Sequence, residues 1–213
     1  TAALLIIGTF AFLASEYQNP KTLGEMTVQK KLLVSFFQSA SGRTAGFSAV
    51  DMNETESHTN FFFAGLMFIG GASASTAGGI KINTFAVVLV AMLAAFVGRN
   101  HASAFGREIP QVQVQRAMVI GAVSAAFVFG VAVVLAATEE AFEFMDLFFE
   151  SVSAFGTVGL STGLTPDLSR WGHLILITAM FLGRLGPLAI ALAMAQRAET
   201  AIYRYPQERV TIG

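Results

Sequence analysis

The sequence predicts an all-α integral membrane protein built from two tandem copies of one unit, in which a helix, a short helix and a return helix follow each other. Three observations lead to this fold class. The composition is strongly apolar, a short Thr-x-Gly motif recurs within a long ungapped echo, and a run of Gly and Ser interrupts an apolar segment that is too long for one straight helix.

The composition indicates which solvent surrounds the chain. Hydrophobic residues make up 54% of the sequence, charged residues only 13%, and the mean hydropathy is +0.62, whereas a soluble domain has about 25% charged residues. The formal net charge of -1 gives no electrostatic case for binding nucleic acid. Because the sequence holds no cysteine, disulfides and thiolate metal sites are excluded. These numbers predict an integral membrane chain.

The internal repeat centres on two Thr-x-Gly motifs. Residues 41–48 read SGRTAGFS and residues 154–161 read AFGTVGLS. At a constant offset of 113 residues the register continues without gaps and pairs identical residues, among them Thr44 with Thr157, Gly46 with Gly159, Ser48 with Ser161 and Phe36 with Phe149. An ungapped echo of this length rarely arises by chance, so we interpret the chain as two copies of one unit.

The first copy begins with the apolar residues 1–14, which are fewer than the roughly 20 that a spanning helix needs. We expect a truncated spanning helix here and a missing upstream half. Residues 16–26 mix charge with Pro and Gly and are predicted to form an aqueous loop. Thr27 can then cap a short helix to about Ala40, with an apolar face that includes Leu32, Leu33, Phe36 and Phe37. This pattern predicts a re-entrant element, after which residues 51–58 return to water.

Residues 60–97 are too long for one straight span, and their middle, residues 70–79, reads GGASASTAGG. Each Gly costs a helix about 1 kcal/mol relative to Ala, so the helix should break here, at membrane depth. Irregular backbone inside a bilayer is tolerated only where it is buried in protein or lines a water-filled cavity. We therefore expect this break to lie on a pathway through the protein.

The second copy repeats this order of elements after a polar linker. We expect the linker at residues 98–115, a full span at 117–137, a short helix to about Ser153, an irregular segment at 156–165, a return span at 171–195 and a tail at 197–213. Thr138, Glu139 and Glu140 are predicted to cap and start the short helix, because hydroxyl and carboxylate groups stabilise a helix N-terminus. The two units are therefore predicted at residues 1–97 and 116–196.

The charges predict the orientation of the units in the membrane. One set of loops is acidic and holds Glu16, Glu25, Asp51, Glu54, Glu56, Glu139, Glu140, Glu143 and Asp146. The other set is basic and holds Arg99, Arg107, Arg197, Arg204 and Arg209. Because cytoplasmic loops are enriched in Lys and Arg, the linker and the tail are predicted to be cytoplasmic, and the short helices enter from outside.

The two irregular segments have the chemistry of a cation site. A short helix that stops at mid-membrane points its C-terminal end, equivalent to roughly half a negative charge, at whatever lies beyond it. In the segment that follows, Gly46 or Gly159 has no Cβ, which lets neighbouring carbonyl oxygens converge and replace water around an ion. Either motif alone is typical of an ordinary turn in a membrane bundle. Two copies in register favour an ion filter.

These motifs together resemble the Trk/Ktr/HKT superfamily of potassium transporters, most closely its KtrB- and TrkH-like membrane subunits. The resemblance covers nearly the whole chain and is carried by RTAGFS at 43–48, FIGG at 68–71, STAGGIK at 75–81, SAFGTVGLS at 153–161, GRLGPL at 183–188 and RYP at 204–206. In this superfamily four helix–pore loop–helix units surround one pore, as in potassium channels. The resemblance implies that this chain supplies the third and fourth of an expected four units.

The resemblance also implies roles for particular residues. The ion filter would consist of Thr44, Ala45, Gly46, Phe47, Thr157, Val158, Gly159 and Leu160. K⁺ would be held by the backbone carbonyls of Thr44, Ala45, Gly46, Thr157, Val158 and Gly159. An intramembrane gate beneath the filter would consist of Gly70, Gly71, Ser73, Ser75, Thr76, Gly78, Gly79, Lys81 and Arg184.

Two of these gate residues keep alternative interpretations. Arg184 falls opposite Gly71 in the repeat, and it is either a latch of the gate or a packing partner for free carbonyls of the loop. Lys81 is either an anchor for the loop or a helix-end residue whose amine reaches toward water.

The resemblance further implies the setting in which the chain works. The implied partners are the missing N-terminal half of the same pore, a second copy in a homodimer, and cytosolic nucleotide-binding regulatory subunits similar to KtrA or TrkA, which the linker and the tail would contact. No cofactor is implied, and K⁺ is the expected transported ion, with Na⁺ as the alternative in a Na⁺-selective member. The expected location is the bacterial plasma (inner) membrane, crossed several times and surrounded by lipid.

Other functional classes match the sequence less well. Residues 78–81, GGIK, lack the GxxxxGK[ST] spacing of a nucleotide-binding P-loop. His58, His101 and His173 have no ligand partners at helical spacing, which argues against a metal site. An intramembrane serine hydrolase that uses Ser73 is the alternative from another class, although residues 71–74, GASA, do not give the expected G-x-S-G.

Overall fold

The structure is a computed structural model that describes residues 1–72, 75–99 and 101–196, with side chains described as far as residue 185. The helices in these ranges are α1 Ala2–Glu16, α2 Val28–Ser41, α3 Ser57–Phe68, α4 Ile82–Phe96, α5 Gln111–Thr138, α6 Phe144–Gly156 and α7 Arg170–Gln196. Two short 3-10 helices, η1 Met52–Glu54 and η2 Thr165–Asp167, and an antiparallel hairpin of β1 Ser103–Ala104 and β2 Arg107–Glu108 complete the described elements.

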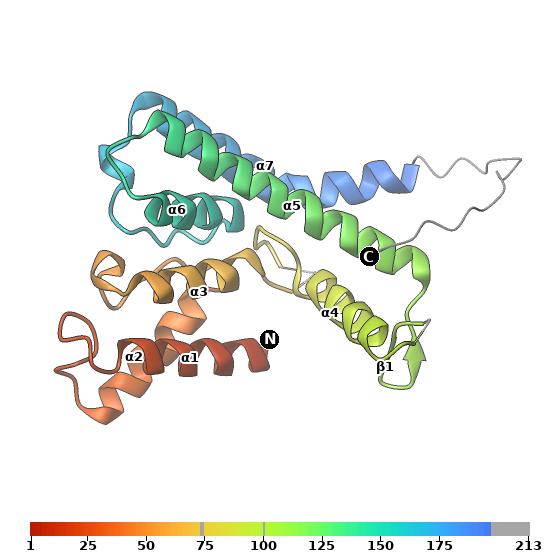
Figure 1. Cartoon of the computed structure of the whole chain (residues 1–213), viewed down its shortest axis with the longest axis horizontal. Coiled ribbons are helices and arrows are strands. Elements are labelled where there is room, and N and C mark those ends of the chain that lie inside the picture. Colours follow the sequence, from red (N-terminus) through yellow and green to blue (C-terminus); the bar gives the residue numbers. More distant parts are fainter. Residues whose placement is uncertain (73–74, 100, 197–213) are drawn as a thin grey trace, which may run out of the picture.

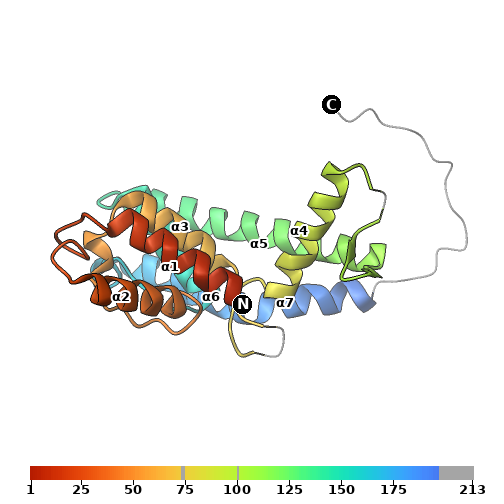
Figure 2. The ribbon, with the colours of Figure 1, turned by 90° about the horizontal axis from the view of Figure 1, so that it is seen from below.

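Two groups of three helices lie side by side, one made of α1, α2 and α3 and the other of α5, α6 and α7 (Figure 1). In each group a short helix, α2 or α6, stands between two other helices in the chain order. Across the boundary between the groups, α3 packs against α6. α4 leaves the first group at an angle and packs on α5 (Figure 2). Each group therefore consists of three consecutive helices, although in the first group α3, with 12 residues, is shorter than α2, with 14 residues.

The core lies where α1, α3, α5 and α6 meet. Phe12 and Phe63, both 0% exposed, meet edge to face with ring centroids 5.3 Å apart. Phe68 of α3 stacks on Phe155 of α6 at 5.9 Å and so joins the two groups. In a bilayer the lipid is as apolar as these side chains, so close packing, more than exclusion of water, holds such helices together.

The long apolar segment of residues 60–97 is broken where its Gly and Ser content predicts. α3 ends at Phe68 and α4 begins only at Ile82. The prediction of a helix break is therefore confirmed, and the break leaves a loop between the two groups of helices.

Two boundaries predicted in the second copy are wrong, namely the start of α5 and the cap of the short helix α6. α5 begins at Gln111, directly after Pro110 and inside the predicted linker 98–115. It continues to Thr138, whose hydroxyl donates to carbonyls one turn earlier in α5 and so extends that helix instead of capping the next one. The N-cap position of α6 is Glu143.

Each group of helices holds a buried glutamate near the end of its first helix. Glu16 is predicted to lie in an aqueous loop, but it is the last residue of α1 and 0% exposed. Its carboxylate accepts the backbone N–H of Glu56 at 3.0 Å, just before α3, and three side chains, those of Asn19, Thr22 and Thr59. Glu139 likewise accepts the backbone N–H of Ser169 at 3.2 Å, just before α7. Glu56 and Ser169 are repeat partners, so Glu139 stabilises α7 and not α6.

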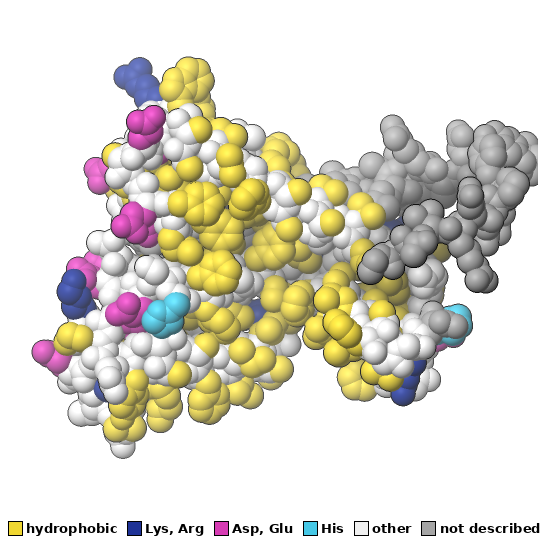
Figure 3. Space-filling model, in the orientation of Figure 1, with side chains coloured by type: hydrophobic (Ala, Val, Ile, Leu, Met, Phe, Trp, Pro, Cys, Tyr) yellow, Lys and Arg dark blue, Asp and Glu magenta, His cyan; other side chains and the backbone are white. Residues whose placement is uncertain are grey.

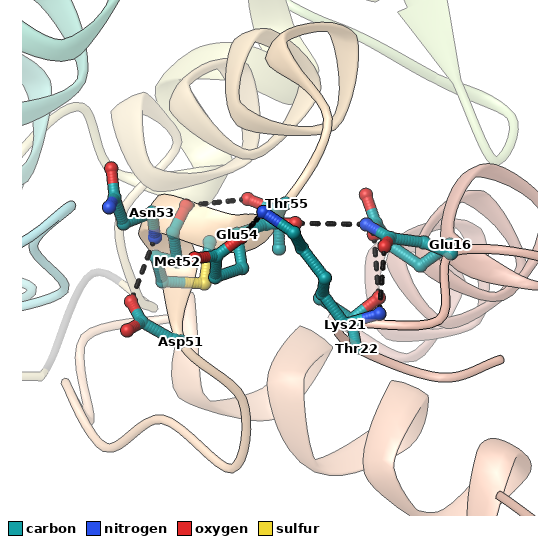
Figure 4. A network of polar contacts seen from close by, with 9 residues as sticks. Glu16, Lys21, Thr22, Asp51, Met52, Asn53, Glu54 and Thr55 are labelled. Carbon is teal, nitrogen blue, oxygen red and sulfur yellow. Dashed lines mark hydrogen bonds and ion pairs between the residues drawn. The ribbon is translucent and has the colours of Figure 1, made fainter. Parts of the chain in front are cut away.

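The loops beside these glutamates gather at one end of the molecule, at the left of Figure 1. Lys21 and Glu54 form an exposed ion pair there (Figure 4), and the hydrogen bond and the charge of Glu54 raise the pKa of Lys21 above its ordinary value. Acidic side chains gather at this end in Figure 3, whereas the β hairpin lies at the opposite end. The acidic loops and the hairpin of the linker therefore lie at opposite ends, while the predicted tail, residues 197–213, lies outside the described residues.

Helix α2 turns its polar side toward the protein. Its buried residues are Lys31, Ser35, Gln38, Ser39 and Ser41, whereas the predicted apolar face of Leu32, Leu33, Phe36 and Phe37 is exposed. The polar side is bound to α1 and its loop, because Lys31 Nζ donates to the carbonyl of Tyr17 at 2.7 Å and Ser39 Oγ to that of Leu5 at 2.9 Å.

Among the described residues, one helix is long and apolar enough to cross a membrane by length and composition, and this helix is α5. The helices α1 and α4 are apolar but shorter.

Candidate functional site

The two Thr-x-Gly segments, residues 44–48 after α2 and residues 157–161 after α6, share an unusual backbone. Thr44 and Gly46 both have a φ of +77°, and their repeat partners Thr157 and Gly159 have φ values of +51° and +92°. A left-handed conformation costs a non-glycine residue about 1–2 kcal/mol, so the surroundings must hold both threonines in place. The sequence echo therefore extends to the backbone conformation.

The segments leave carbonyl groups unpaired. Among the described residues, no hydrogen bond is donated to the carbonyl oxygens of Thr44, Ala45, Gly46, Thr157, Val158 and Gly159. Carbonyl groups in protein interiors are normally paired, and a cluster of unpaired ones can coordinate a cation or water. The C-terminal ends of α2 and α6 precede the segments, and their partial negative charge also favours a cation.

The two segments lie against each other at their glycines. A Cβ on Gly46 would collide with the carbonyl oxygen of Val158, and the nearest atom to a Cβ on Gly159 would be the Cα of Gly46 at 3.7 Å. Gly46 is therefore required by space as well as by its φ, whereas Gly159 is required by its φ alone.

A loop of residues 69–81 joins α3 to α4 and is closed at its neck. Ile69 and Ile80 form a parallel bridge, and the N–H of Gly70 donates to the carbonyl of Ile80 at 2.8 Å. A Cβ on Gly70 would collide with the carbonyl oxygen of Gly78, so the two sides of the loop touch through their backbones. The Gly content that breaks the helix also allows this close approach.

The loop is bonded to the surroundings of both segments. The N–H of Gly78 donates to Thr157 Oγ1 at 2.9 Å, which ties the loop to the first residue of the second segment. Arg43, directly before the first segment, donates from Nη2 to the carbonyl of Gly70 at 3.0 Å. A displacement of the loop has to break these bonds, so the loop and the two segments are mechanically connected.

Four of the predicted gate residues carry polar side chains within the loop. Lys81 Nζ donates to the carbonyls of Ser75 at 3.1 Å and Ala77 at 2.5 Å, which is the arrangement expected of an anchor for the loop. Ser75 and Thr76 are exposed. Ser73 lies outside the described residues.

Arg184 lies on α7 beside the loop. The residue before it, Gly183, accepts the N–H of Gly79 at 3.3 Å, so Arg184 belongs to the turn of α7 that touches the loop. Its side chain is exposed, and its positive charge is near enough to repel the ammonium group of Lys81. Among the described residues, no hydrogen bond or ion pair involves its guanidinium.

Sequence reasoning assigned no role to the side chains of Arg43 and Thr157. Both bind the loop, and Arg43 has a second nitrogen, Nη1, that is buried without a partner in the described part of the chain. The available signal was the charge of Arg43 within the otherwise uncharged residues 32–50, because a charge at membrane depth is retained only where it has a partner or a function. The partner itself could not be read from the sequence.

Comparison with known proteins adds independent evidence. A family model described as TrkH, cation transport protein, matches residues 2–203. The Ktr system potassium uptake protein B of Vibrio alginolyticus is 40% identical over 213 residues, which are 100% of this chain and 46% of that protein. Its counterpart in Bacillus subtilis (strain 168) is also 40% identical over 100% of this chain and 47% of its own length. The potassium/sodium uptake protein NtpJ of Enterococcus hirae is 40% identical over 221 residues, 48% of that protein.

These comparisons also describe length and fold. The chain spans about half the length of the curated relatives it matches. Among solved structures, the potassium transporter TrkH from Vibrio parahaemolyticus is similar with a TM-score of 0.69, covering 92% of this chain and 42% of that chain at 18% sequence identity. At this identity the likeness concerns the fold alone.

Proposed function

Because this chain belongs to the TrkH family of cation transport proteins, we propose that it is part of the ion-translocating membrane subunit of a potassium uptake system. Its relatives are transporters and not enzymes, so the serine hydrolase alternative is set aside. Two relatives are named for potassium uptake and a third for potassium and sodium uptake. K⁺ is the proposed ion, and a Na⁺-selective member of the family is the second candidate.

The observation that carries the proposal is the pair of matching segments whose carbonyls accept no hydrogen bond from the described part of the chain. Thr44, Gly46, Thr157 and Gly159 all have positive φ, and the two glycines lie against each other. We propose that the carbonyls of residues 44–46 and 157–159 replace part of the hydration shell of the ion. The adjoining Phe47 and Leu160 would complete the filter.

Two segments can supply only part of a filter that surrounds an ion. We propose that residues 1–97 and 116–196 act as the third and fourth helix–pore loop–helix units of a four-part pore, with the remaining units in the part of the longer relatives that this chain does not match. Residues 98–115 would form a cytoplasmic linker. The hairpin of this linker presents a fully exposed Phe105, which would suit a contact with a cytosolic regulatory subunit. A homodimer is the proposed assembly.

The loop of residues 69–81 would act as the gate beneath the filter. In the described arrangement it is held by Lys81, by Arg43 and by the hydroxyl of Thr157. We propose that the ion passes when these bonds are released, and that Arg184 opposes passage by its positive charge while the loop is in place. The Gly residues of the loop would allow the movement because they leave the backbone unhindered.

The filter proposal is tested by Gly159→Ser in the complete protein, expressed in cells that lack other potassium uptake. A side chain at a φ of +92° strains the backbone, so the preference for K⁺ over Na⁺ in uptake assays is expected to fall. Uptake with unchanged K⁺ preference would rule the segment out as a filter. The absence of any ion flux in vesicles that hold the wild-type protein would point to a purely structural subunit.

A further inference from the structure

The outer end of the first segment is held by a side chain from the short helix before it. Gln38 of α2 is 0% exposed, and its Nε2 donates to Ser48 Oγ at 3.1 Å. Its Oε1 accepts the backbone N–H of Ala49 at 3.4 Å. One buried amide therefore binds the last residue of the segment and the residue that follows.

The second segment is held in the same way by a carboxylate. Glu150 of α6, which is 5% exposed, accepts a hydrogen bond from Ser161 Oγ and another from the backbone N–H of Thr162 at 3.1 Å. A third donor is Thr165 Oγ1, at 3.0 Å. Ser161 and Thr162 are the repeat partners of the two residues that Gln38 binds, so the same two groups are held in both copies.

The holding residue itself is not conserved between the copies. Glu150 is the repeat partner of Phe37, one position before Gln38, and the amide of one copy is a carboxylate in the other. A buried carboxylate is costly unless hydrogen bonds compensate for its lost hydration. Among the described residues no ion pair involves Glu150, so its three donors are what compensate it. The contact is retained although the residue and its position differ, which points to the contact as the required feature.

We propose that Gln38 and Glu150 are positioning residues that fix the outer ends of the two filter segments and thereby set the preference for K⁺. This inference rests on the proposed function. Ser161 lies two residues from Gly159, so a shift of the hydroxyl moves the backbone whose carbonyls would face the ion. Hydrogen bonding, and not the negative charge, is the required property, because the neutral Gln38 performs the same task in the first copy.

The test compares Glu150→Ala and Glu150→Gln in the complete protein, with K⁺ uptake measured in competition with Na⁺. Glu150→Ala is expected to lower the preference for K⁺ by about tenfold, the equivalent of roughly one net hydrogen bond. Glu150→Gln should restore most of the preference, as its amide can still bind the segment. The matched control is Glu139→Ala, which removes another buried carboxylate that binds Ser169 instead of the segment. This control should lower thermal stability and leave the preference unchanged.

Each other outcome decides against the proposal. If Gly159→Ser alters the preference while Glu150→Ala behaves like the Glu139→Ala control, the positioning role is wrong and the filter stands. If neither Gly159→Ser nor Glu150→Ala alters the preference for K⁺, the proposed function fails as well. Equal losses in Glu150→Gln and Glu150→Ala would show that charge is the required property. If Glu150→Ala does not accumulate in the membrane, Ser161→Ala replaces it in the test. The preference for K⁺ of Ser161→Ala is expected to fall roughly two- to tenfold, and an unchanged preference overturns the proposal.

Discussion

Alanine substitution should affect the two glycines of the proposed filter, Gly46 and Gly159, unequally. A Cβ on Gly46 meets the carbonyl oxygen of Val158, whereas a Cβ on Gly159 has its nearest neighbour at 3.7 Å, an ordinary contact distance. Both positions have a positive φ. Both variants therefore strain the backbone at a positive φ, but only Gly46→Ala also creates a steric collision, although the two residues are equivalent in the repeat.

The difference can be estimated from these contacts. The left-handed conformation costs alanine about 1–2 kcal/mol at either position. At Gly46 the backbone of Val158 must also move, and such overpacking typically costs about 1–3 kcal/mol. The free energy of unfolding should therefore fall by about 2–5 kcal/mol in Gly46→Ala and by about 1–2 kcal/mol in Gly159→Ala. Because the carbonyl of Val158 is one of the proposed ion ligands, its displacement should also lower the K⁺ preference of Gly46→Ala below that of Gly159→Ala.

The assay is K⁺ uptake against increasing Na⁺ in vesicles that contain the complete protein, with thermal unfolding measured on the same samples. Gly121→Ala is the control, since no atom lies within 4 Å of a Cβ built at this position in α5. It should keep the K⁺ preference and gain up to about 1 kcal/mol of helix stability. A Gly159→Ala variant as impaired as Gly46→Ala, or a Gly121→Ala variant with altered preference, would refute the reasoning.

Three further substitutions test the gate and the outer loops. Thr157→Val keeps the side-chain shape but removes the hydroxyl that accepts a loop N–H, so the initial K⁺ uptake rate should rise roughly two- to tenfold; an unchanged rate would contradict a holding role. Arg184→Gln should raise the rate, since the positive charge beside the loop would repel a passing cation, whereas Arg170→Gln at the start of α7 should not. Lys21→Met should leave uptake and stability nearly unchanged at pH 7, as an exposed pair contributes little. Pairing with Glu54 raises the pKa of Lys21 above 10.5. The small contribution of this ion pair to stability is therefore fully present below pH 10.5 and is lost only as the pH rises beyond the raised pKa. Unfolding measured at about pH 7 and at about pH 11 checks this dependence.

The parts of the fold that follow local rules could be predicted from the sequence. The offset of 113 residues pairs Thr44 with Thr157 and Gly46 with Gly159, and all four residues have a positive φ in the structure. The Gly and Ser run between α3 and α4 correctly predicted a helix break, because glycine is a poor helix former wherever it occurs.

The parts that depend on distant residues could not be predicted. Glu139 follows a threonine and precedes a short helix, which is a local capping pattern, but its carboxylate binds Ser169, 30 residues away. Glu16 likewise resembles a loop acid until Thr59 and the amide of Glu56 are brought beside it by the fold. A carboxylate is satisfied by whichever donors reach it, and the sequence does not reveal which donors these are.

The two copies agree at the segments and differ beneath them, and this difference bears on the proposed mechanism. Gly70 and Gly183 are repeat partners, and a Cβ on either would collide with a backbone carbonyl. Gly70 already lies in the loop that follows α3, whereas α7 continues through Gly183 to Gln196. A filter benefits from equivalent copies, because similar carbonyls share the charge of the ion. A gate needs only one copy to depart from the pattern. The asymmetry therefore supports the proposal that the shared segments recognise the ion and that the loop between α3 and α4 controls its passage.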